Sequence, residues 1–251
     1  MNNKVEMDSE FYKQVTHLFW TGGWDSTFRL LQLLFLEKKT VQPHYLIRPQ
    51  ECTGKEIDTI HKIERQILRD HPETEELLLP IKFFNVEHLK PDIEISSAYN
   101  RIKDRQYISI QYQMLARYCK QEGLESVELG VLGRETFEYF KTITTIFRYF
   151  EFPILGLTKP EMARISDKNG WIKYMKMTGF CRRPKKGKPC GICGPCSDAV
   201  IMGVGWRLPM KARIIANIQI PFRKWWRNNY KKQNSGAFKK FKDFMERRGM
   251  V

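Results

Sequence analysis

The fold is decided by residues 16–38, which read THLFWTGGWDSTFRLLQLLFLEK. The apolar run at 16–20 has the length of a buried strand, and two glycines follow it almost directly. From residue 25 to residue 38, apolar side chains recur every three or four positions, as on one face of a helix, at Phe28, Leu31, Leu34 and Phe35. The stretch therefore predicts a strand, a glycine turn and an amphipathic helix.

The chain continues with the same alternation of apolar runs and amphipathic stretches. Further strands are expected at 41–48, 77–86 and 126–132, and further helices at 53–71, 104–122, 158–170 and 171–178. Strands that alternate with helices indicate a mostly parallel sheet covered by helices on both faces. We therefore predict an α/β, doubly wound fold.

The composition is that of a globular protein. The chain has 251 residues, of which 42% are hydrophobic and 28% charged, so a fibrous or wholly disordered protein is excluded. No stretch approaches the roughly 18 apolar residues of a membrane-spanning helix. The first residues carry acids and no apolar run, so no signal peptide is expected and we predict a cytoplasmic protein.

The positive charge is concentrated at the C-terminal end. Residues 207–251 hold 13 Lys and Arg but 2 Asp and Glu, and so carry +11 of the net +15. Aromatic residues such as Trp225, Trp226 and Tyr230 lie between them, and 237–248 has the pattern of a docking helix. Three interpretations stay open: a tail packed on the domain, a nucleic-acid-binding segment, or an anchor for an anionic membrane surface.

The glycine turn has the features of a phosphate site. Gly22 and Gly23 allow a ligand to approach the backbone, and the helix after them presents free N–H groups. Thr21 and Ser26 add hydroxyl groups, and Asp25 is a candidate helix cap. The pattern is neither a Walker A motif nor a dinucleotide-binding fingerprint, so a purely structural turn remains the alternative.

Four of the six cysteines lie within sixteen residues, at Cys181, Cys190, Cys193 and Cys196. Such spacing in an intracellular protein predicts a metal site, and four thiolates satisfy tetrahedral Zn²⁺. An iron–sulfur cluster uses the same ligands and stays an alternative. Because protein atoms fill all four positions, the metal is expected to be structural. Cys52 and Cys119 are expected to be free thiols.

Together these motifs resemble a known enzyme family. Residues 21–26 are similar to the Ser-Gly-Gly-x-Asp-Ser loop of the PP-loop ATP pyrophosphatases, with Thr21 in place of Ser. The cysteine order resembles that of 7-cyano-7-deazaguanine synthase within that superfamily. Weaker similarities to the synthase lie at Arg105-Gln106, at Glu128-Leu129-Gly130 and at residues 159–162. Residues 133–143 lack the synthase's deazapurine-recognition pattern, which indicates a divergent paralogue with another acceptor.

The resemblance implies an adenine nucleotide alpha hydrolase-like fold and an ATP-dependent ligase. With Mg²⁺, such an enzyme cleaves ATP to AMP and pyrophosphate and adenylates a carboxylate or amide, which ammonia or another amine then attacks. It implies catalytic roles for Asp25, Ser26, Lys159 and Arg105. It also implies nucleotide contacts from Thr21, Gly22, Gly23, Trp24, Asp25, Ser26 and Gly130. The expected partners are a small-molecule acceptor and a second copy of the chain.

We therefore expect three parts: a PP-loop nucleotide-binding domain at 1–180, a four-cysteine zinc element at 181–206 and a basic, aromatic-rich helical tail at 207–251. Two alternatives to a ligase remain. One is a non-catalytic ATP sensor whose tail binds nucleic acid. The other is a zinc-containing nucleic-acid adaptor with no nucleotide chemistry. Some synthase-like proteins belong to bacterial defence or surface-polysaccharide systems, and such a specialised role would suit the divergence.

Overall fold

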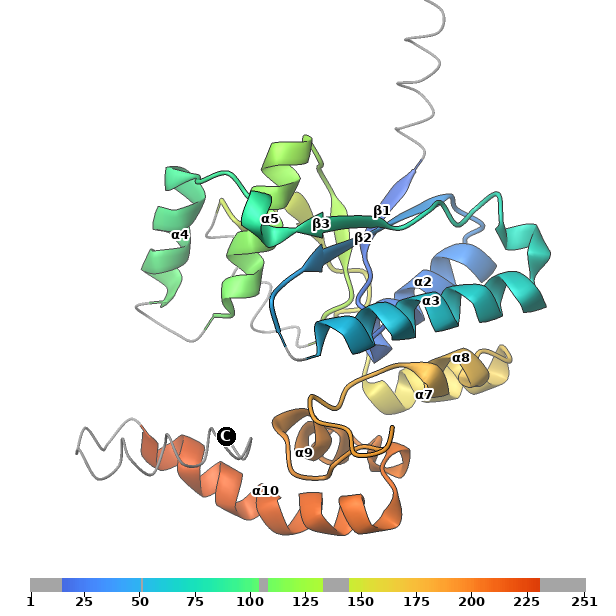
Figure 1. The fold of residues 1–251 in the computed structure, drawn as a ribbon, viewed down its shortest axis with the longest axis vertical. Helices are drawn as coiled ribbons and strands as arrows, with labels where there is room; N and C mark the ends of the chain where they lie inside the picture. The colour runs from blue at the N-terminus through green and yellow to red at the C-terminus, as the bar shows by residue number, and fades with distance from the viewer. Residues whose placement is uncertain (1–14, 51, 104–107, 133–144, 231–251) are drawn as a thin grey trace, which may run out of the picture. The chain divides into compact units, whose positions relative to one another are not determined.

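The computed structural model describes residues 15–50, 52–103, 108–132 and 145–230, with side chains up to residue 223 at the C-terminal end. The chain divides into two compact units (Figure 1). The first contains the residues up to Leu157 together with Asn169–Thr178. The second contains Thr158–Lys168 and the residues from Gly179 onward. The cysteine cluster and the helix after it thus share one unit.

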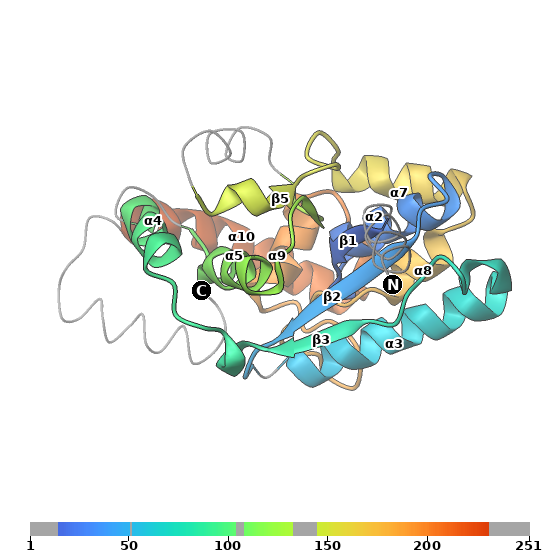
Figure 2. The same cartoon turned by 90° about the horizontal axis from the view of Figure 1, so that it is seen from above.

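The first unit is built on a five-stranded sheet. Its strands are β1 (Thr16–Phe19), β2 (Val41–Ile47), β3 (Lys82–Asn85), β4 (Val127–Leu129) and β5 (Phe150–Glu151). Their order is β3-β2-β1-β4-β5, every pair is parallel, and β2 runs between β1 and β3 (Figure 2). The predicted α/β class with a parallel sheet is confirmed. The direction of winding reverses between β1 and β4, and ligands of such sheets bind at that point.

Helices cover both faces of the sheet (Figure 1). α2 (Trp24–Phe35) and α3 (Thr53–Asp70) lie on one side, and α4 (Ile93–Lys103) and α5 (Ile110–Glu122) on the other. Successive side chains of β2 show the two faces: the Tyr45 hydroxyl donates to Glu56 of α3, whereas His44 bonds to Tyr118 of α5. α8 (Ile172–Met177) is joined to α3, because Tyr174 donates to Asp70.

Some elements differ from those expected. β3 is shorter than the predicted strand 77–86, where Leu78 makes one isolated bridge to Val41 and Pro80 has no N–H to donate. α5 begins at Ile110, capped by the Ser109 hydroxyl, and not at 104, which lies among residues outside the description. The sequence did not predict α4 or the two-residue strand β5.

The second unit contains α7 (Lys159–Lys168), α9 (Gly194–Ile201) and α10 (Met210–Tyr230). Short 3₁₀ turns complete the two units, at Pro72–Thr74, Val86–His88, Phe147–Tyr149 and Gly205–Arg207. Small residues of α10, Ala212 and Ala216, are buried with the cysteines in one apolar cluster. The expected docking helix at 237–248 lies outside the described residues. Among the helices that are described, none has both the length and the apolar character needed to cross a membrane.

Candidate functional site

The glycine turn joins β1 to α2 at the carboxyl edge of the sheet. Gly22 has φ +67°, a conformation that favours glycine. A Cβ at this position would lie 3.2 Å from both Ile60 Cγ1 and Thr59 Cγ2, on α3. The backbone conformation therefore favours glycine at this position, and a Cβ would also be tightly packed against α3.

The N-terminus of α2 is left without a side-chain cap. Gly23 occupies the N-cap position and has no side chain to bond the first amides, which the helix itself cannot satisfy. The suggestion that Asp25 caps the helix is wrong, because α2 begins at Trp24 and places Asp25 inside the first turn. These amides and the positive end of the helix dipole suit a phosphate group.

Two hydroxyl groups meet across the turn. The Ser26 hydroxyl accepts a hydrogen bond from the Thr21 amide at 3.3 Å, and its oxygen lies 3.4 Å from the Thr21 hydroxyl oxygen. Ser26 also donates a long bond of 3.5 Å to the Gly23 carbonyl. The two hydroxyl groups that were predicted to bind phosphate, those of Thr21 and Ser26, are thus neighbours in the turn. Trp24, in contrast, is a core residue with 3% of its surface exposed.

Gly130 lies directly against this turn. It follows β4, and a Cβ on it would come within 2.5 Å of the Ser26 amide nitrogen and 2.7 Å of the Asp25 carbonyl carbon. No side chain fits at that distance, so the end of β4 contacts the first turn of α2 backbone to backbone. The resemblance implies a nucleotide contact for Gly130, and the structure places this residue beside the predicted phosphate loop.

A buried ion pair joins helix α2 to strand β4. Arg29 of α2 donates to both carboxylate oxygens of Glu128 in β4, at 2.6 and 2.9 Å, and also bonds to Glu37. Arg29 is 6% exposed and Glu128 9%. The sequence analysis did not identify this pair, because nothing local to either residue indicates the other. The pair fixes α2 on β4 close to Gly130 and the turn.

A small pocket lies beside the turn and has a cavity volume of about 30 Å³. It combines apolar side chains with polar ones, and its lining includes Phe19, Thr21, His44, Tyr45, Leu46, Arg48, Glu56, Gln111, Met114 and Leu115. Thr21 belongs to both the turn and the pocket. The pocket therefore adjoins the predicted phosphate site and has room for about one water-sized group in this conformation.

The buried imidazole of His44 lines this pocket. His44 bonds to the Tyr118 hydroxyl at 2.8 Å and to His17 at 2.9 Å. Burial, together with the nearby charges of His17 and Lys82, lowers the pKa of His44 to about 3. His44 is therefore neutral at physiological pH, and its ring serves hydrogen bonding. This network was not predicted from the sequence, because a single His within a strand belongs to no motif that indicates its hydrogen-bond partner.

Of the other two predicted catalytic residues, one belongs to the second unit and one lies outside the described residues. Lys159 is the first residue of α7, which belongs to the second unit. Arg105 lies outside the described residues, as do residues 133–143. Cys119 is fully buried in α5, where burial raises the pKa of its thiol, so it is an unreactive thiol.

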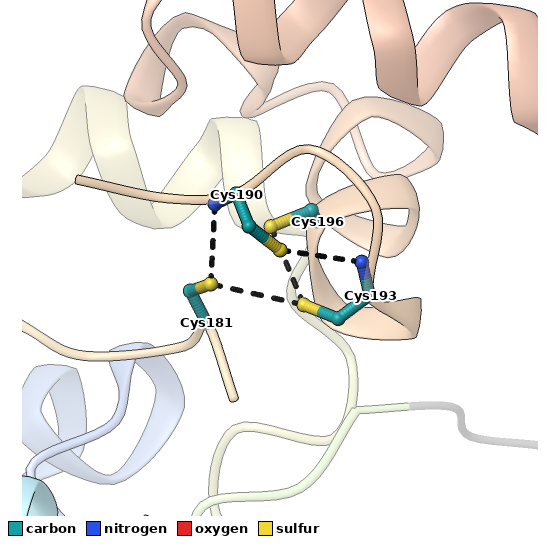
Figure 3. Close-up of side chains that lie close together, drawn as sticks. All are labelled: Cys181, Cys190, Cys193 and Cys196. Atoms are coloured by element: carbon teal, nitrogen blue, oxygen red, sulfur yellow. Dashed lines mark hydrogen bonds between the residues drawn. The ribbon is translucent and has the colours of Figure 1, made fainter. Parts of the chain in front are cut away.

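The predicted cysteine cluster forms in the second unit (Figure 3). The sulfur atoms of Cys181, Cys190, Cys193 and Cys196 all lie within 4.8 Å of one another. The Cys193 sulfur is 3.4 Å from that of Cys196 and 3.8 Å from that of Cys181. Four thiolates around one Zn²⁺ lie about 3.8 Å apart, because each Zn–S bond is about 2.3 Å long and the angles are tetrahedral. The cluster therefore fits a metal ion such as zinc.

Backbone amides support the sulfur atoms. The Cys190 amide donates to the Cys181 sulfur at 3.3 Å, and the Cys193 amide donates to the Cys190 sulfur at 3.4 Å (Figure 3). The Ile192 amide also donates to the Cys190 sulfur, at 3.3 Å. The tight turn between Cys190 and Cys193, here called the knuckle, requires Gly191, which has φ +75°. A Cβ at Gly191 would lie 2.3 Å from the Ala212 carbonyl oxygen of α10.

A side chain of α10 is hydrogen-bonded to the same knuckle. Arg223, which is 7% exposed, donates to the Ile192 carbonyl at 2.7 Å. The cysteine cluster is thus connected to α10 at two places. Gly191 packs against Ala212, and Arg223, about three helical turns further along α10, bonds to Ile192. This arrangement indicates a structural site, since four protein sulfurs leave no open coordination position.

The sequence matches no protein-family model, and no curated protein matches it either.

Proposed function

We propose that this chain is an ATP-dependent adenylating enzyme of the PP-loop type, with an adenine nucleotide alpha hydrolase-like fold. One observation carries the proposal: an uncapped helix N-terminus, two glycines and two facing hydroxyls meet Gly130 where the winding of the sheet reverses. Parallel α/β sheets bind ligands at that position, and an N-terminus of this kind binds phosphate.

In this proposal the turn holds the phosphates of ATP. The amides at Gly22, Gly23 and Trp24 and the hydroxyls of Thr21 and Ser26 bind pyrophosphate oxygens, and Asp25 orients Mg²⁺. The adenosine part is proposed to enter the neighbouring pocket, which pairs apolar side chains with polar ones beside Thr21 and must widen to admit it. Lys159 and Arg105 are proposed to stabilise the charge on the leaving pyrophosphate.

The reaction has two steps. A carboxylate or amide oxygen of the acceptor attacks the α-phosphorus of ATP, and the bond to the β-phosphate oxygen breaks to release pyrophosphate. Ammonia or another amine then attacks the activated carbon, and AMP leaves with the oxygen. The resemblance to 7-cyano-7-deazaguanine synthase makes 7-carboxy-7-deazaguanine the first acceptor to test. The cysteine cluster, with zinc bound, would stabilise the second unit and take no part in these steps.

The test separates binding from turnover. We expect the protein to bind α,β-methylene ATP, whose α–β bridge cannot be cleaved, and to form AMP and pyrophosphate from ATP when the acceptor is present. Binding of the analogue that is equally tight in Ser26→Ala would contradict the assignment of the turn. Binding without turnover on any acceptor would favour the ATP-sensing alternative.

A further inference from the structure

A hairpin in the second unit carries a concentrated positive charge that the proposed ATP site does not use. Between Cys181 and Cys190 the chain reads RRPKKGKP, with five basic residues at Arg182, Arg183, Lys185, Lys186 and Lys188. All five are exposed. The sequence from 168 to 197 contains no Asp or Glu, so this part of the chain has a strongly positive net charge.

The hairpin has a defined backbone conformation. The Lys185 amide donates to the Lys188 carbonyl at 2.9 Å, and the Lys188 amide donates to the Lys185 carbonyl at 3.0 Å. The two residues between them, Lys186 and Gly187, both have positive φ, at 47° and 74°. This is the two-residue type I′ turn of a tight hairpin, in which Asn-Gly is the favoured sequence. Here a lysine occupies the position that usually holds Asn.

The hairpin sets like charges directly opposite each other. Residues that exchange both backbone hydrogen bonds have Cα atoms about 5.5 Å apart and side chains on one face. Lys185 and Lys188 are such a pair, and Lys186 sits between them at the tip. Opposed like charges destabilise a hairpin, so an anion bound between them would relieve a repulsion present in the free protein.

The base of the hairpin is fixed by the cysteine cluster. The Cys190 amide donates to the Cys181 sulfur at 3.3 Å, so the first and last residues of the loop are held together. Cationic side chains on a clasped loop lose less conformational freedom on binding than those of a free tail. The basic charge of this chain is therefore partly organised on a preformed surface and is not confined to residues 207–251.

We propose that the hairpin at 182–188 is a binding site for the sugar-phosphate backbone of a nucleic acid, with RNA as the probe. Regularly spaced phosphates match cations held a few ångströms apart, and Lys and Arg contacts to phosphate are the main source of such affinity. A membrane surface fits less well, because the segment has no aromatic or large aliphatic side chain to enter the lipid. The site is independent of the proposed ATP chemistry.

The test compares two charge-reversal variants of the full-length protein. K185E/K188E replaces one like-charged pair in the hairpin by another, so the repulsion between the strands is retained. K55E/K62E reverses two exposed charges on α3 of the first unit, outside both the hairpin and the basic tail, and is the matched control. Binding of a labelled single-stranded RNA of about 20 nucleotides is followed by fluorescence anisotropy over a range of salt concentrations.

We expect K185E/K188E to weaken RNA binding about tenfold or more, and to reduce the slope of log affinity against log salt by about 1.4, since each single-strand phosphate contact contributes about 0.7. The control should weaken binding by less than about twofold. The proposal is overturned if both variants lose affinity equally, because the effect is then one of net charge. It is also overturned if the unchanged protein does not bind RNA, or if hairpin-dependent binding is found for phosphatidylserine vesicles and not for RNA.

Discussion

Gly130 and Ser26 are in contact through their backbones: a Cβ on Gly130 would lie 2.5 Å from the Ser26 amide nitrogen. The two residues are far apart in sequence and belong to the strand end and the helix start between which the winding of the sheet reverses. A larger residue at 130 would push the first turn of α2 away from β4. This contact therefore controls the position of the amides that we assign to phosphate binding.

Gly130→Ala should lower both stability and ATP cleavage. Overpacking of this kind typically costs about 1–3 kcal/mol, because backbone atoms must move to make space. Urea unfolding measures the first effect and AMP release the second. Gly156→Ala is the matched control, since a Cβ at Gly156 would meet nothing within 4 Å. Equal stability and activity of Gly130→Ala and Gly156→Ala would show that the close approach has no role.

Arg29→Met should destabilise the first unit by about 3–5 kcal/mol, because it leaves the buried Glu128 carboxylate without its bidentate partner. Equilibrium urea unfolding measures the loss. Arg65→Met, at an exposed position on α3, should change stability by less than about 0.5 kcal/mol. The double variant Arg29→Met/Glu128→Leu should recover much of the loss, since it removes both charges. A double variant less stable than Arg29→Met would contradict this account of the pair.

Cys193→Ser should abolish stoichiometric zinc binding and lower the melting temperature of the second unit, since the folding of such sites is coupled to the metal. Elemental analysis by mass spectrometry measures zinc per chain, and calorimetry measures unfolding. Cys52→Ser, which changes a thiol of the first unit outside the cluster, should retain the metal. Iron in place of zinc in the purified protein would support the iron–sulfur alternative.

Acid should weaken the first unit through His44. The folded pKa is about 3 and the ordinary value is 6.5, so between these values the unfolded chain binds a proton that the folded chain does not. Stability is therefore greatest above pH 6.5 and falls as the pH drops, by about 2 kcal/mol between pH 7.5 and pH 5. Urea unfolding at the two pH values measures this slope.

His44→Phe should reduce the slope, although His17, whose pKa burial also lowers, will leave part of it. His88→Gln, at an exposed position, is the control and should leave the slope as it is. An unchanged slope in His44→Phe would mean that acid sensitivity arises elsewhere.

Local patterns in the sequence were sufficient to predict some of the strands and helices and the cysteine cluster. The run of β1, the turn and α2 was predicted because its apolar side chains have clear strand and helix periods. The four cysteines were assigned together because their close spacing is typical of metal ligands. α4 and β5 were not predicted: β5 has two residues, too few to show any period. The unpredicted start of α5 depends on the Ser109 cap.

The contacts that join distant residues could not be predicted from one sequence. Arg29 and Glu128 are separated by 99 positions, and His44 and Tyr118 by 74. Each pairing exists because the strand order places its elements side by side, and that order is a property of the whole chain. Local reasoning identified the residues of the turn but assigned Asp25 to a cap position that Gly23 occupies.

The most direct test of the proposed function is the fate of ATP. The protein is incubated with Mg²⁺, ATP, ammonium and a set of carboxylic acids that includes 7-carboxy-7-deazaguanine, and the nucleotides and acids are followed by mass spectrometry. We predict AMP and pyrophosphate in equal amounts with one of the acids, and their loss in Ser26→Ala. Formation of ADP and phosphate, or equal AMP from Ser26→Ala, or failure of the unchanged protein to bind ATP, would contradict the proposal.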